Sequence, residues 1–207
     1  MTHESMATTS GRGGGSDTSP AAFAVTPLEL RGLLLIQLAV HGDRRGFFTE
    51  RFHLGRFRQH GVPTAFVQDN QSRSAPGVVR GLHYQHAPPQ GKLVGATRGR
   101  IWDVAVDIRP GSPTYGHHRT AELSDMNGRL LWIPPGFAHG FCVLGDEAAD
   151  VLYKVDAPYD PDGEGEIRWS DESLAIEWPV AHLVASDRDT RSQSFEEYTA
   201  HPPTWTR

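Results

Sequence analysis

Apolar and polar residues alternate along short segments of the chain, and the clearest alternation covers residues 101–108. On an extended backbone Trp102 and Val104 share one face with the later apolar positions, while Asp103 and Asp107 lie on the other face. A period of two is typical of a half-buried strand. We therefore expect a strand here, with Asp103 facing away from Trp102.

Similar short apolar segments, separated by turns with Gly, Pro or Asp, continue through most of the sequence. Those interpreted as strands are residues 28–40, 66–72, 77–85, 92–98, 119–123, 130–134, 140–144 and 150–155. A turn is expected at Gly42-Asp43, and residues 53–60 predict a short helix that ends at Gly61. Many short strands with few short helices indicate a mainly β sandwich or barrel. No repeat of about 20 to 50 residues points to a propeller or solenoid.

The chain of 207 residues is long enough for one domain with a sizeable core. Residues 1–24 include a Gly- and Ser-rich stretch with few large apolar groups, and they predict a disordered tail because little burial offsets the entropy cost of ordering. The β-rich domain is expected over residues 25–190. After Trp178 the pattern becomes loop-like, and residues 191–207 are expected to form a C-terminal extension with a helix around residues 192–200.

The charge balance argues against a nucleic acid or an anionic membrane as partner. The formal net charge is -5, and no run of Lys or Arg is present. The apolar run at residues 33–40 is too short to span a bilayer, and the first residues lack the pattern of a signal peptide. Cys142 is the only cysteine, which excludes an intrachain disulfide and fits the reducing cytoplasm.

The segment at residues 77–85 holds Arg80 and His83 between apolar and aromatic neighbours. Such a pair would place an anion-binding guanidinium and a base with a near-neutral pKa in one partly buried place. A single histidine between strands is more often a structural residue than a catalyst, so other segments must support a function. Only Lys92 and Lys154 are lysines among 20 basic residues, which suggests a specific use for an ammonium group.

Two histidine motifs resemble those of cupins. Residues 134–139 have Pro-x-Gly-x-x-His spacing that ends at His139, and residues 77–83 have the opening of the companion motif. In metal-binding cupins the first motif continues to a second histidine and then a glutamate. Here Gln85 stands at the second histidine position and no glutamate follows in the loop. A neutral amide is a poor ligand for Zn²⁺ or Fe²⁺, so we expect no metal and no other cofactor.

A site without a metal would depend on proton transfer, for example removal of a proton next to a carbonyl group. That chemistry needs a base, a cation to hold the developing enolate, and an acid that returns a proton to the opposite face. His83, Lys92 and Tyr153 supply these three types of group. A charge at about 4 Å contributes roughly 4 kcal/mol at an effective dielectric near 20. An ammonium beside the enolate oxygen would therefore lower the barrier materially.

Five motifs together resemble the dTDP-4-dehydrorhamnose 3,5-epimerase family across about residues 25–190. They are residues 66–70 (Phe-Val-Gln-Asp-Asn), 80–83 (Arg-Gly-Leu-His), 103–107 (Asp-Val-Ala-Val-Asp), 132–141 and 152–154 (Leu-Tyr-Lys). The resemblance implies a cupin-like jelly-roll β-sandwich or barrel. It also implies epimerisation at C3 and C5 of dTDP-4-dehydro-6-deoxy-D-glucose to dTDP-4-dehydro-L-rhamnose, in deoxysugar biosynthesis.

The resemblance also assigns catalytic roles to individual positions. It implies that His83 is the general base and that Asp189 orients and polarises it, with Asp103 as the competing partner. An Asp on the second ring nitrogen would fix the tautomer and stabilise the imidazolium. Tyr153 would be the proton donor to the opposite face, and Lys92 would stabilise the enolate.

The resemblance further implies contacts to the nucleotide-sugar. Arg80 would bind the diphosphate, since a guanidinium forks onto phosphate oxygens. Further substrate contacts are expected from Gln68, Asn70, His139 and Tyr159. In the family, Arg45 and Glu50 lie on an N-terminal segment that reaches the neighbouring subunit's site, which implies a homodimer.

Three positions depart from the family pattern: His41, where an aromatic that stacks on the nucleobase is common, Gln71, where a histidine is common, and Gly95, where a larger basic residue is usual. These departures bear on nucleotide preference and product.

The alternative functions are a single-site epimerase acting at C3 or C5, a 3,4-ketoisomerase, a sugar-nucleotide binding module without catalysis, and a metal-dependent oxygenase or isomerase.

Overall fold

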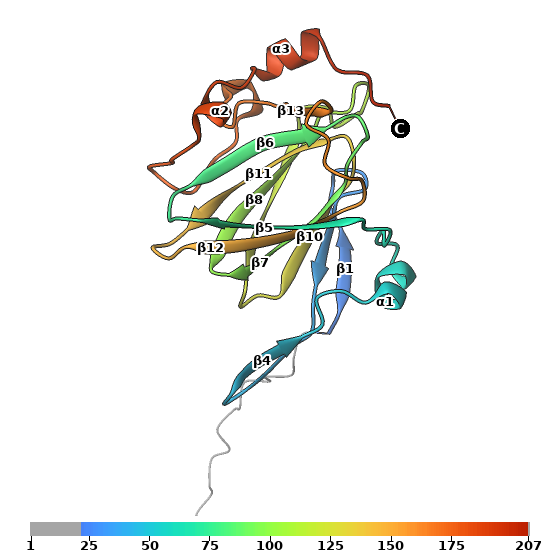
Figure 1. The fold of residues 1–207 in the computed structure, drawn as a ribbon, viewed down its shortest axis with the longest axis vertical. Helices are drawn as coiled ribbons and strands as arrows, with labels where there is room; N and C mark the ends of the chain where they lie inside the picture. The colour runs from blue at the N-terminus through green and yellow to red at the C-terminus, as the bar shows by residue number, and fades with distance from the viewer. Residues whose placement is uncertain (1–21, 207) are drawn as a thin grey trace, which may run out of the picture.

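The computed structural model describes residues 22–206, and most of them form two antiparallel β-sheets (Figure 1). The first sheet has the order β1 (Ala24–Pro27), β2 (Leu34–Gln37), β10 (Arg129–Ile133), β7 (Lys92–Arg98), β12 (Ala149–Val155) and β5 (Gln68–Ser74). The second has the order β13 (Glu164–Glu166), β6 (Val79–Gln85), β11 (Phe137–Leu144), β8 (Arg100–Asp107) and β9 (His118–Ser124). This arrangement confirms the predicted mainly β sandwich.

The two sheets face each other, and their inward apolar side chains form the main core. Val94 and Val151 come from the first sheet, and Ile101 and Phe141 come from the second. Each is buried because alternate residues of a strand point to the same side. Toward β6 and β12 the inward positions become polar, and that end of the sandwich carries the candidate site.

Strand β8 differs from the expected half-buried strand because both of its faces are covered. Ile101 and Ala105 face the interior of the sandwich, whereas Val104 and Val106 pack in a second core cluster with residues of the C-terminal segment, including Tyr198. The alternation therefore assigned the faces correctly but not their exposure. The face that carries Asp103 points into the sandwich, and the apolar face is covered by the C-terminal segment, which no pattern local to the strand reveals.

Four short helices accompany the sheets among the described residues: α1 (Leu54–Gln59), the 3-10 helix η1 (Glu172–Leu174), α2 (Asp187–Thr190) and α3 (Phe195–Ala200). The helices predicted over residues 53–60 and 192–200 correspond to α1 and α3. Helix α1 begins where His53 accepts a hydrogen bond from the backbone N–H of Arg56. Helix α2 was not predicted. None of the helices that the structure describes is long and apolar enough to cross a membrane.

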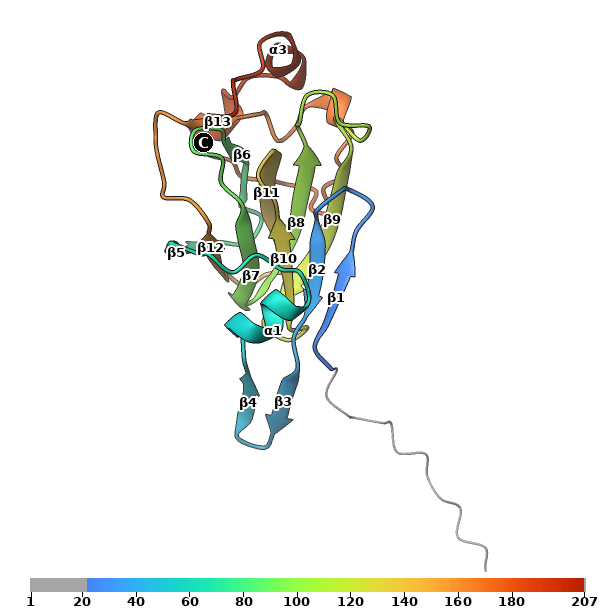
Figure 2. The same ribbon diagram turned by 90° about the vertical axis from the view of Figure 1, so that its right-hand side faces the viewer.

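A two-stranded hairpin of β3 (Val40–Asp43) and β4 (Gly46–Thr49) projects from the body of the molecule (Figures 1 and 2). Its turn lies at residues 44–45, two positions after the expected turn at Gly42-Asp43. At the opposite end, residues 167–205 run over the outer face of the second sheet, where the hydroxyl of Tyr198 donates to the carbonyl of Ile108 at 2.9 Å. The tail predicted for residues 1–24 lies, up to residue 21, outside the described residues.

Candidate active site

A β-bulge in β6 brings Arg80 and His83 to the same side of their strand. Residues three apart on a regular strand point to opposite faces. Against β11, however, His83 pairs with His139 and Arg80 pairs with Phe141, so β6 has one residue more than its partner in this stretch. The extra residue turns both side chains toward one cavity, which is where their spacing in the sequence led us to expect them.

Gly81 and Gly140 make this bulge sterically possible. A Cβ on Gly81 would lie 2.6 Å from the Cα of Gly140, and a Cβ on Gly140 would lie 2.7 Å from the carbonyl oxygen of Arg80. Gly81 also has a φ of +122°, a conformation that side chains rarely adopt. The two backbones therefore approach more closely than residues with side chains would permit.

The cavity between the sheets has a volume of about 160 Å³. Its lining residues are Ser72, Arg80, His83, Lys92, His139, Phe141 and Tyr153. His83 and His139 come from the second sheet, whereas Lys92 and Tyr153 come from β7 and β12 of the first. A molecule bound in the cavity would thus meet imidazoles on one side and a phenol with an amine on the other.

His83 has a buried carboxylate as its partner. Its Nε2 lies 2.6 Å from Oδ1 of Asp189, which α2 places behind the cavity wall. The hydroxyl of Ser186 donates to the other oxygen at 2.9 Å. Burial alone would raise the pKa of Asp189, but the hydrogen bond and the nearby charge of His83 lower the pKa below its usual value. Asp189 therefore stays ionised and can support a positive charge on His83.

Asp103, the competing partner in the sequence analysis, is bonded to His139 instead. Its Oδ2 lies 2.9 Å from Nε2 of His139, and both side chains are buried. Because His139 is the register partner of His83, two histidine–carboxylate pairs lie side by side in the second sheet. The pairing of His139 with Asp103 was not anticipated from the sequence.

Lys92 and Tyr153 have pKa values that burial shifts in opposite directions. Burial lowers the pKa of Lys92 to about 8, although Glu164 and Asp103 oppose the shift. Burial raises the pKa of Tyr153, and the negative charge of Glu164 adds to the effect. At neutral pH the cavity thus holds an ammonium group and a protonated phenol. Lys154 points to the other side of β12, where it pairs with Asp69 at 2.8 Å.

Arg80 lies at the exposed rim of the cavity. Its Nε donates to the hydroxyl of Ser74 at 2.9 Å, and among the described residues it forms no ion pair with a carboxylate. The guanidinium therefore retains donors that could bind an anion.

Gln68, Asn70 and Tyr159 form a connected group beside the cavity. The amide of Gln68 donates to Oδ1 of Asn70 at 2.8 Å, and the backbone N–H of Tyr159 donates to Oε1 of Gln68 at 3.1 Å. Asn70 is the register partner of Tyr153, which lines the cavity. These three predicted contact residues thus lie together at one side of the site.

Arg45 and Glu50 are not brought to the cavity of their own chain. Arg45 lies at the tip of the β3–β4 hairpin, where 84% of its side chain is exposed and its guanidinium binds Asp43. Glu50 follows the hairpin and pairs with Arg56 at 2.7 Å. His41, Gln71 and Gly95, the positions that depart from the family pattern, do not line the cavity either.

Ser72 and Phe141 line the cavity but were not singled out from the sequence. Both could have been found by alternation, since Ser72 follows Gln68 and Asn70 on one face of β5, and Phe141 follows His139 on β11. Gln85 does not point a ligand atom into the cavity, because its amide is bonded to backbone groups of two loops. Among residues 22–206, no group of three or more His, Cys, Asp or Glu side chains could hold a metal ion.

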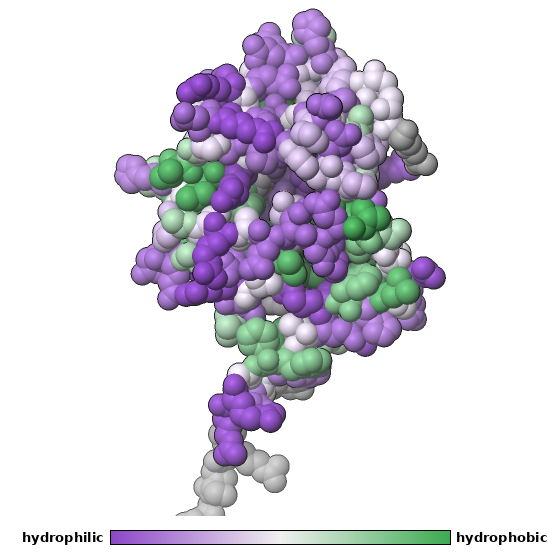
Figure 3. Space-filling model, viewed as in Figure 1, coloured by the Kyte–Doolittle hydropathy of each residue, from purple (hydrophilic) through white to green (hydrophobic). Residues whose placement is uncertain are grey.

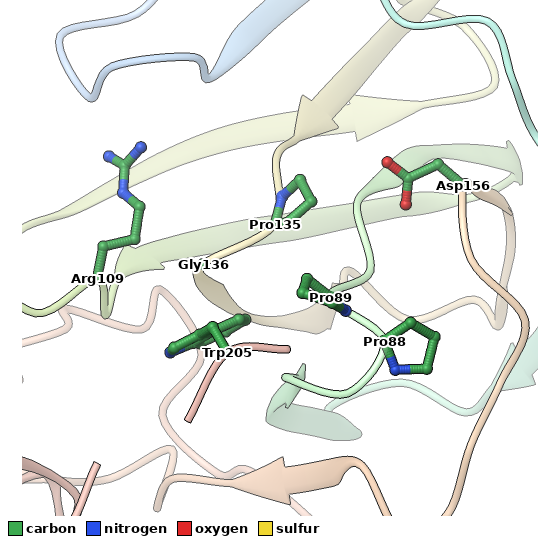
Figure 4. A pocket seen from close by; sticks show the side chains of 7 residues that line it. All are labelled: Pro88, Pro89, Arg109, Pro135, Gly136, Asp156 and Trp205. Carbon is green, nitrogen blue, oxygen red and sulfur yellow. The ribbon is translucent and has the colours of Figure 1, made fainter. Parts of the chain in front are cut away.

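A larger cavity of about 550 Å³ lies elsewhere, between Pro88, Pro135 and Trp205 (Figure 4). Arg109 also lines it, but its guanidinium donates to both oxygens of Asp107, at 2.8 and 2.7 Å. This cavity therefore offers fewer available catalytic groups than the smaller one. We take the smaller cavity as the candidate active site.

The fold and the smaller cavity define a class of protein: a two-sheet β-sandwich whose enclosed site combines a histidine–carboxylate pair, an amine and a phenol for acid–base chemistry. A family model described as dTDP-4-dehydrorhamnose 3,5-epimerase matches residues 27–197. The chain belongs to this family of epimerases, which confirms the resemblance identified from the motifs.

Individual relatives agree with this assignment. The dTDP-4-dehydrorhamnose 3,5-epimerase of Shigella flexneri is 50% identical over 173 residues, which cover 83% of this chain and 95% of the relative. The structure of dTDP-6-deoxy-D-glucose-3,5-epimerase from Legionella pneumophila, in complex with dTDP-4-keto-L-rhamnose, matches with a TM-score of 0.83 and 41% identity, covering 90% of this chain and 100% of that chain. A 4-keto-6-deoxy sugar epimerase from the novobiocin biosynthetic gene cluster of Streptomyces spheroides matches with a TM-score of 0.85 and 35% identity, covering 92% and 98%.

Proposed function

We propose that this protein epimerises dTDP-4-dehydro-6-deoxy-D-glucose at C3 and C5 to give dTDP-4-dehydro-L-rhamnose. The observation that carries the proposal is the placement of His83, paired with Asp189, and of Tyr153 on opposite sheets around one cavity. Inverting a carbon requires removal of a proton from one face and delivery of a proton to the other. The named activities of relatives that match most of their own length support the same reaction.

In the proposed mechanism, His83 takes the proton from a carbon next to the C4 ketone, and the C–H electrons form an enolate. Asp189 stabilises the resulting imidazolium. The ammonium of Lys92 stabilises the negative charge on the enolate oxygen. Tyr153 then donates its phenolic proton to the opposite face of the same carbon, which restores the ketone with inverted configuration. C3 and C5 are both adjacent to C4, so the same groups serve each carbon in turn.

The nucleotide part of the substrate is assigned to the rim of the cavity. Arg80 holds the diphosphate, because its guanidinium lies at the rim without a carboxylate partner among the described residues. Gln68, Asn70 and Tyr159 contact the substrate from one side as a connected group. His139, which is hydrogen-bonded to Asp103, contacts the substrate from the second sheet.

The active form is proposed to be a homodimer in which the β3–β4 hairpin of one subunit completes the site of the other. The hairpin projects from the body and exposes Phe47 by 52% and Phe48 by 69%. In Figure 3 the tip of the hairpin is hydrophilic, and hydrophobic residues lie between this tip and the body of the molecule. Exposed aromatic side chains on a projecting hairpin are typical of an interface. Arg45 and Glu50 would reach the partner's substrate by this route.

The proposed reaction needs no metal and takes place in the cytoplasm. In support of the first point, Gln85 stands where a metal-binding site would have a histidine, and its amide is bonded to backbone groups. In support of the second, the single cysteine, Cys142, is a free buried thiol, as is usual for a reducing compartment.

The proposal is tested by incubating the purified protein with dTDP-4-dehydro-6-deoxy-D-glucose in deuterated buffer. We expect deuterium at both C3 and C5, with inverted configuration at each, by NMR of the product. Absence of deuterium at both carbons would refute the proposed chemistry. Incorporation at one carbon only would identify a single-site epimerase instead. A ketone at C3 in the product would identify a ketoisomerase.

A further inference from the structure

Gln85 ends β6 with a buried amide whose bonds reach two loops. Its Nε2 donates to the carbonyl of Pro88 at 2.8 Å and to the carbonyl of Pro158 at 3.0 Å. Its Oε1 accepts from the backbone N–H of Asp160 at 3.0 Å. One side chain thus connects the loop after β6 with the segment at residues 156–160 that follows β12.

The segment at residues 156–160 carries Tyr159 between the two backbone groups that Gln85 binds. A second amide supports it, since Nε2 of Gln90 donates to the carbonyl of Ala157 at 2.9 Å. On its other side the segment meets the residues assigned to substrate binding. There the backbone N–H of Tyr159 donates to Gln68, and the hydroxyl of Tyr159 donates to Glu164 at 3.0 Å. The position of Tyr159 is therefore determined by hydrogen bonds on both sides of the segment.

Packing alone does not hold these two loops in place. Pro88, Pro89 and Asp156 line the cavity of about 550 Å³, so open space borders the loops on that side (Figure 4). Side chains next to a cavity have fewer contacts that would resist a displacement. The position of the segment therefore depends more on the hydrogen bonds of Gln85 than it would if the segment were close-packed on all sides.

We propose that Gln85 is a positioning residue for the substrate, acting through the segment that carries Tyr159. This inference rests on the proposed function, which assigns Tyr159 to the substrate. Gln85 does not line the catalytic cavity and does not touch the reacting carbons. Its loss therefore displaces the binding contact of Tyr159 while His83 and Lys92 keep their places on the sheets.

The test substitutes Gln85→Met, which keeps the length and shape of the side chain but removes the amide and every hydrogen bond it makes, including the one that Oε1 accepts from Nε2 of Gln90 at 3.5 Å. We expect KM to rise about tenfold, as for the loss of one net hydrogen bond to the substrate, with kcat reduced no more than about threefold. If KM stays at the wild-type value, the inference is wrong. If the variant does not fold, Gln85→Glu serves instead, because it retains the acceptor for Asp160 and loses both donors; the same rise in KM is expected.

Asn127→Leu is the matched control. Asn127 also binds three backbone groups, accepting from Ser124 and Arg129 at 3.0 Å and donating to Glu122 at 2.9 Å, but it does so in the turn between β9 and β10, away from the catalytic cavity. Loss of its amide should lower the melting temperature as the Gln85 variant does and leave KM unchanged. A rise in KM in this variant as well would indicate a general effect of destabilisation.

A double-mutant cycle with Tyr159→Ala tests the route of the effect. If Gln85 acts through Tyr159, Gln85→Met has no further effect on KM when Tyr159 is already truncated. A full additional rise would show that Gln85 acts by another route and would overturn the inference. Wild-type protein is run in parallel in deuterated buffer. Failure of the wild type to exchange refutes the proposed function, whereas wild-type turnover with an unchanged KM in Gln85→Met refutes only the positioning role.

Discussion

His83 and Asp189 are 106 positions apart in the sequence, yet their side chains meet at 2.6 Å. The strand β6 fixes the imidazole, and the short helix α2, capped by Ser186, fixes the carboxylate. Because the carboxylate binds one ring nitrogen, the other nitrogen is left for the substrate, and the tautomer of His83 is determined. The pair therefore orients the imidazole so that its free nitrogen can act as a base toward a substrate in the cavity.

Replacing Asp189 by Asn keeps the size of the group but removes its charge and can impose the wrong tautomer on His83. We expect kcat to fall by a factor of about 100 to 10,000. The rate of deuterium uptake by the substrate is the measurement, because it reports proton removal directly. Asp187→Asn, on the same helix with 93% of its side chain exposed, is the control and should leave the rate unchanged. Equal rates in both variants would contradict the assignment.

Tyr153→Phe removes the acid but leaves the base and the shape of the ring. His83 should still form the enolate, which is then reprotonated from the side on which the proton left. We expect deuterium uptake without inversion, and epimerised product reduced by a factor of about 100 to 10,000. NMR distinguishes uptake from inversion in one sample. Tyr84→Phe is the control, since Tyr84 lies on the outer face of β6 and accepts a hydrogen bond from Gln193. Normal inversion by the Tyr153 variant would remove Tyr153 as the acid.

The lowered pKa of Lys92 predicts the alkaline limit of activity. The ammonium is lost as the pH rises through about 8, so kcat/KM should fall above that pH. Tyr153 cannot cause this limit, because burial raises its pKa above the ordinary value. Lys92→Arg should be slower at every pH but should not lose activity near pH 8, since a guanidinium stays protonated. Lys154→Arg is the control and should keep the wild-type profile. A wild-type profile that is flat to pH 9 would exclude a required Lys92 ammonium.

Stability should respond to the same titration with the opposite sign. In the folded protein the pKa of Lys92 is lowered, so between about pH 8 and its ordinary pKa of 10.5 the unfolded chain binds more protons than the folded chain. The Lys92 contribution therefore favours folding increasingly as the pH rises through this window, while activity declines. Loss of activity above pH 8 without a drop in melting temperature would separate titration of the site from unfolding.

The sequence predicted most strands of the two sheets and most of the residues that line the cavity, but it missed β1 and β13 and interpreted residues 28–40 as one strand, where the structure has β2 over Leu34–Gln37 only, followed by the start of β3. Alternation placed Asp103 on the face opposite Trp102, because a period of two is a local property of an extended chain. Local patterns could not reveal the bulge that aligns Arg80 with His83. That bulge depends on how β6 meets β11, two strands far apart in the sequence.

Local sequence patterns likewise could not predict which carboxylate pairs with which histidine. Asp189 follows no strand, and only the family resemblance connected it to His83. Asp103 was a plausible partner for His83 until the register of β8 with β11 placed it beside His139. The partners of the interior polar residues therefore depend on strand pairing, which the local pattern of a single sequence does not reveal.

Adding a single methyl group at Gly140 should destabilise the folded protein. A Cβ at this position would meet the carbonyl oxygen of Arg80 at 2.7 Å and a methyl group of Leu82 at 2.9 Å, and the backbone oxygen cannot move without disturbing the pairing of β6 with β11. We expect Gly140→Ala to lower the free energy of unfolding by about 1–3 kcal/mol. Thermal and urea denaturation measure the change. In Gly42→Ala the nearest atom would be at 3.8 Å, so stability should be unaffected. Equal stability of the two variants would contradict the close approach.

The proposed dimer makes a prediction about mixing two damaged proteins. Arg45→Ala removes the hairpin residue that would reach the partner's site, and His83→Asn removes the base, so each variant alone should have low activity. In a mixed dimer, one site has its own His83 and receives the partner's intact hairpin. After subunit exchange of an equal mixture we expect about one quarter of wild-type activity, since half of the dimers are mixed and each has one complete site. Native mass spectrometry of differently tagged chains verifies the exchange, and Arg44→Ala, at the same hairpin tip, is the control that should be active alone. Mixed dimers that form and stay inactive would show that the hairpin does not act across the interface.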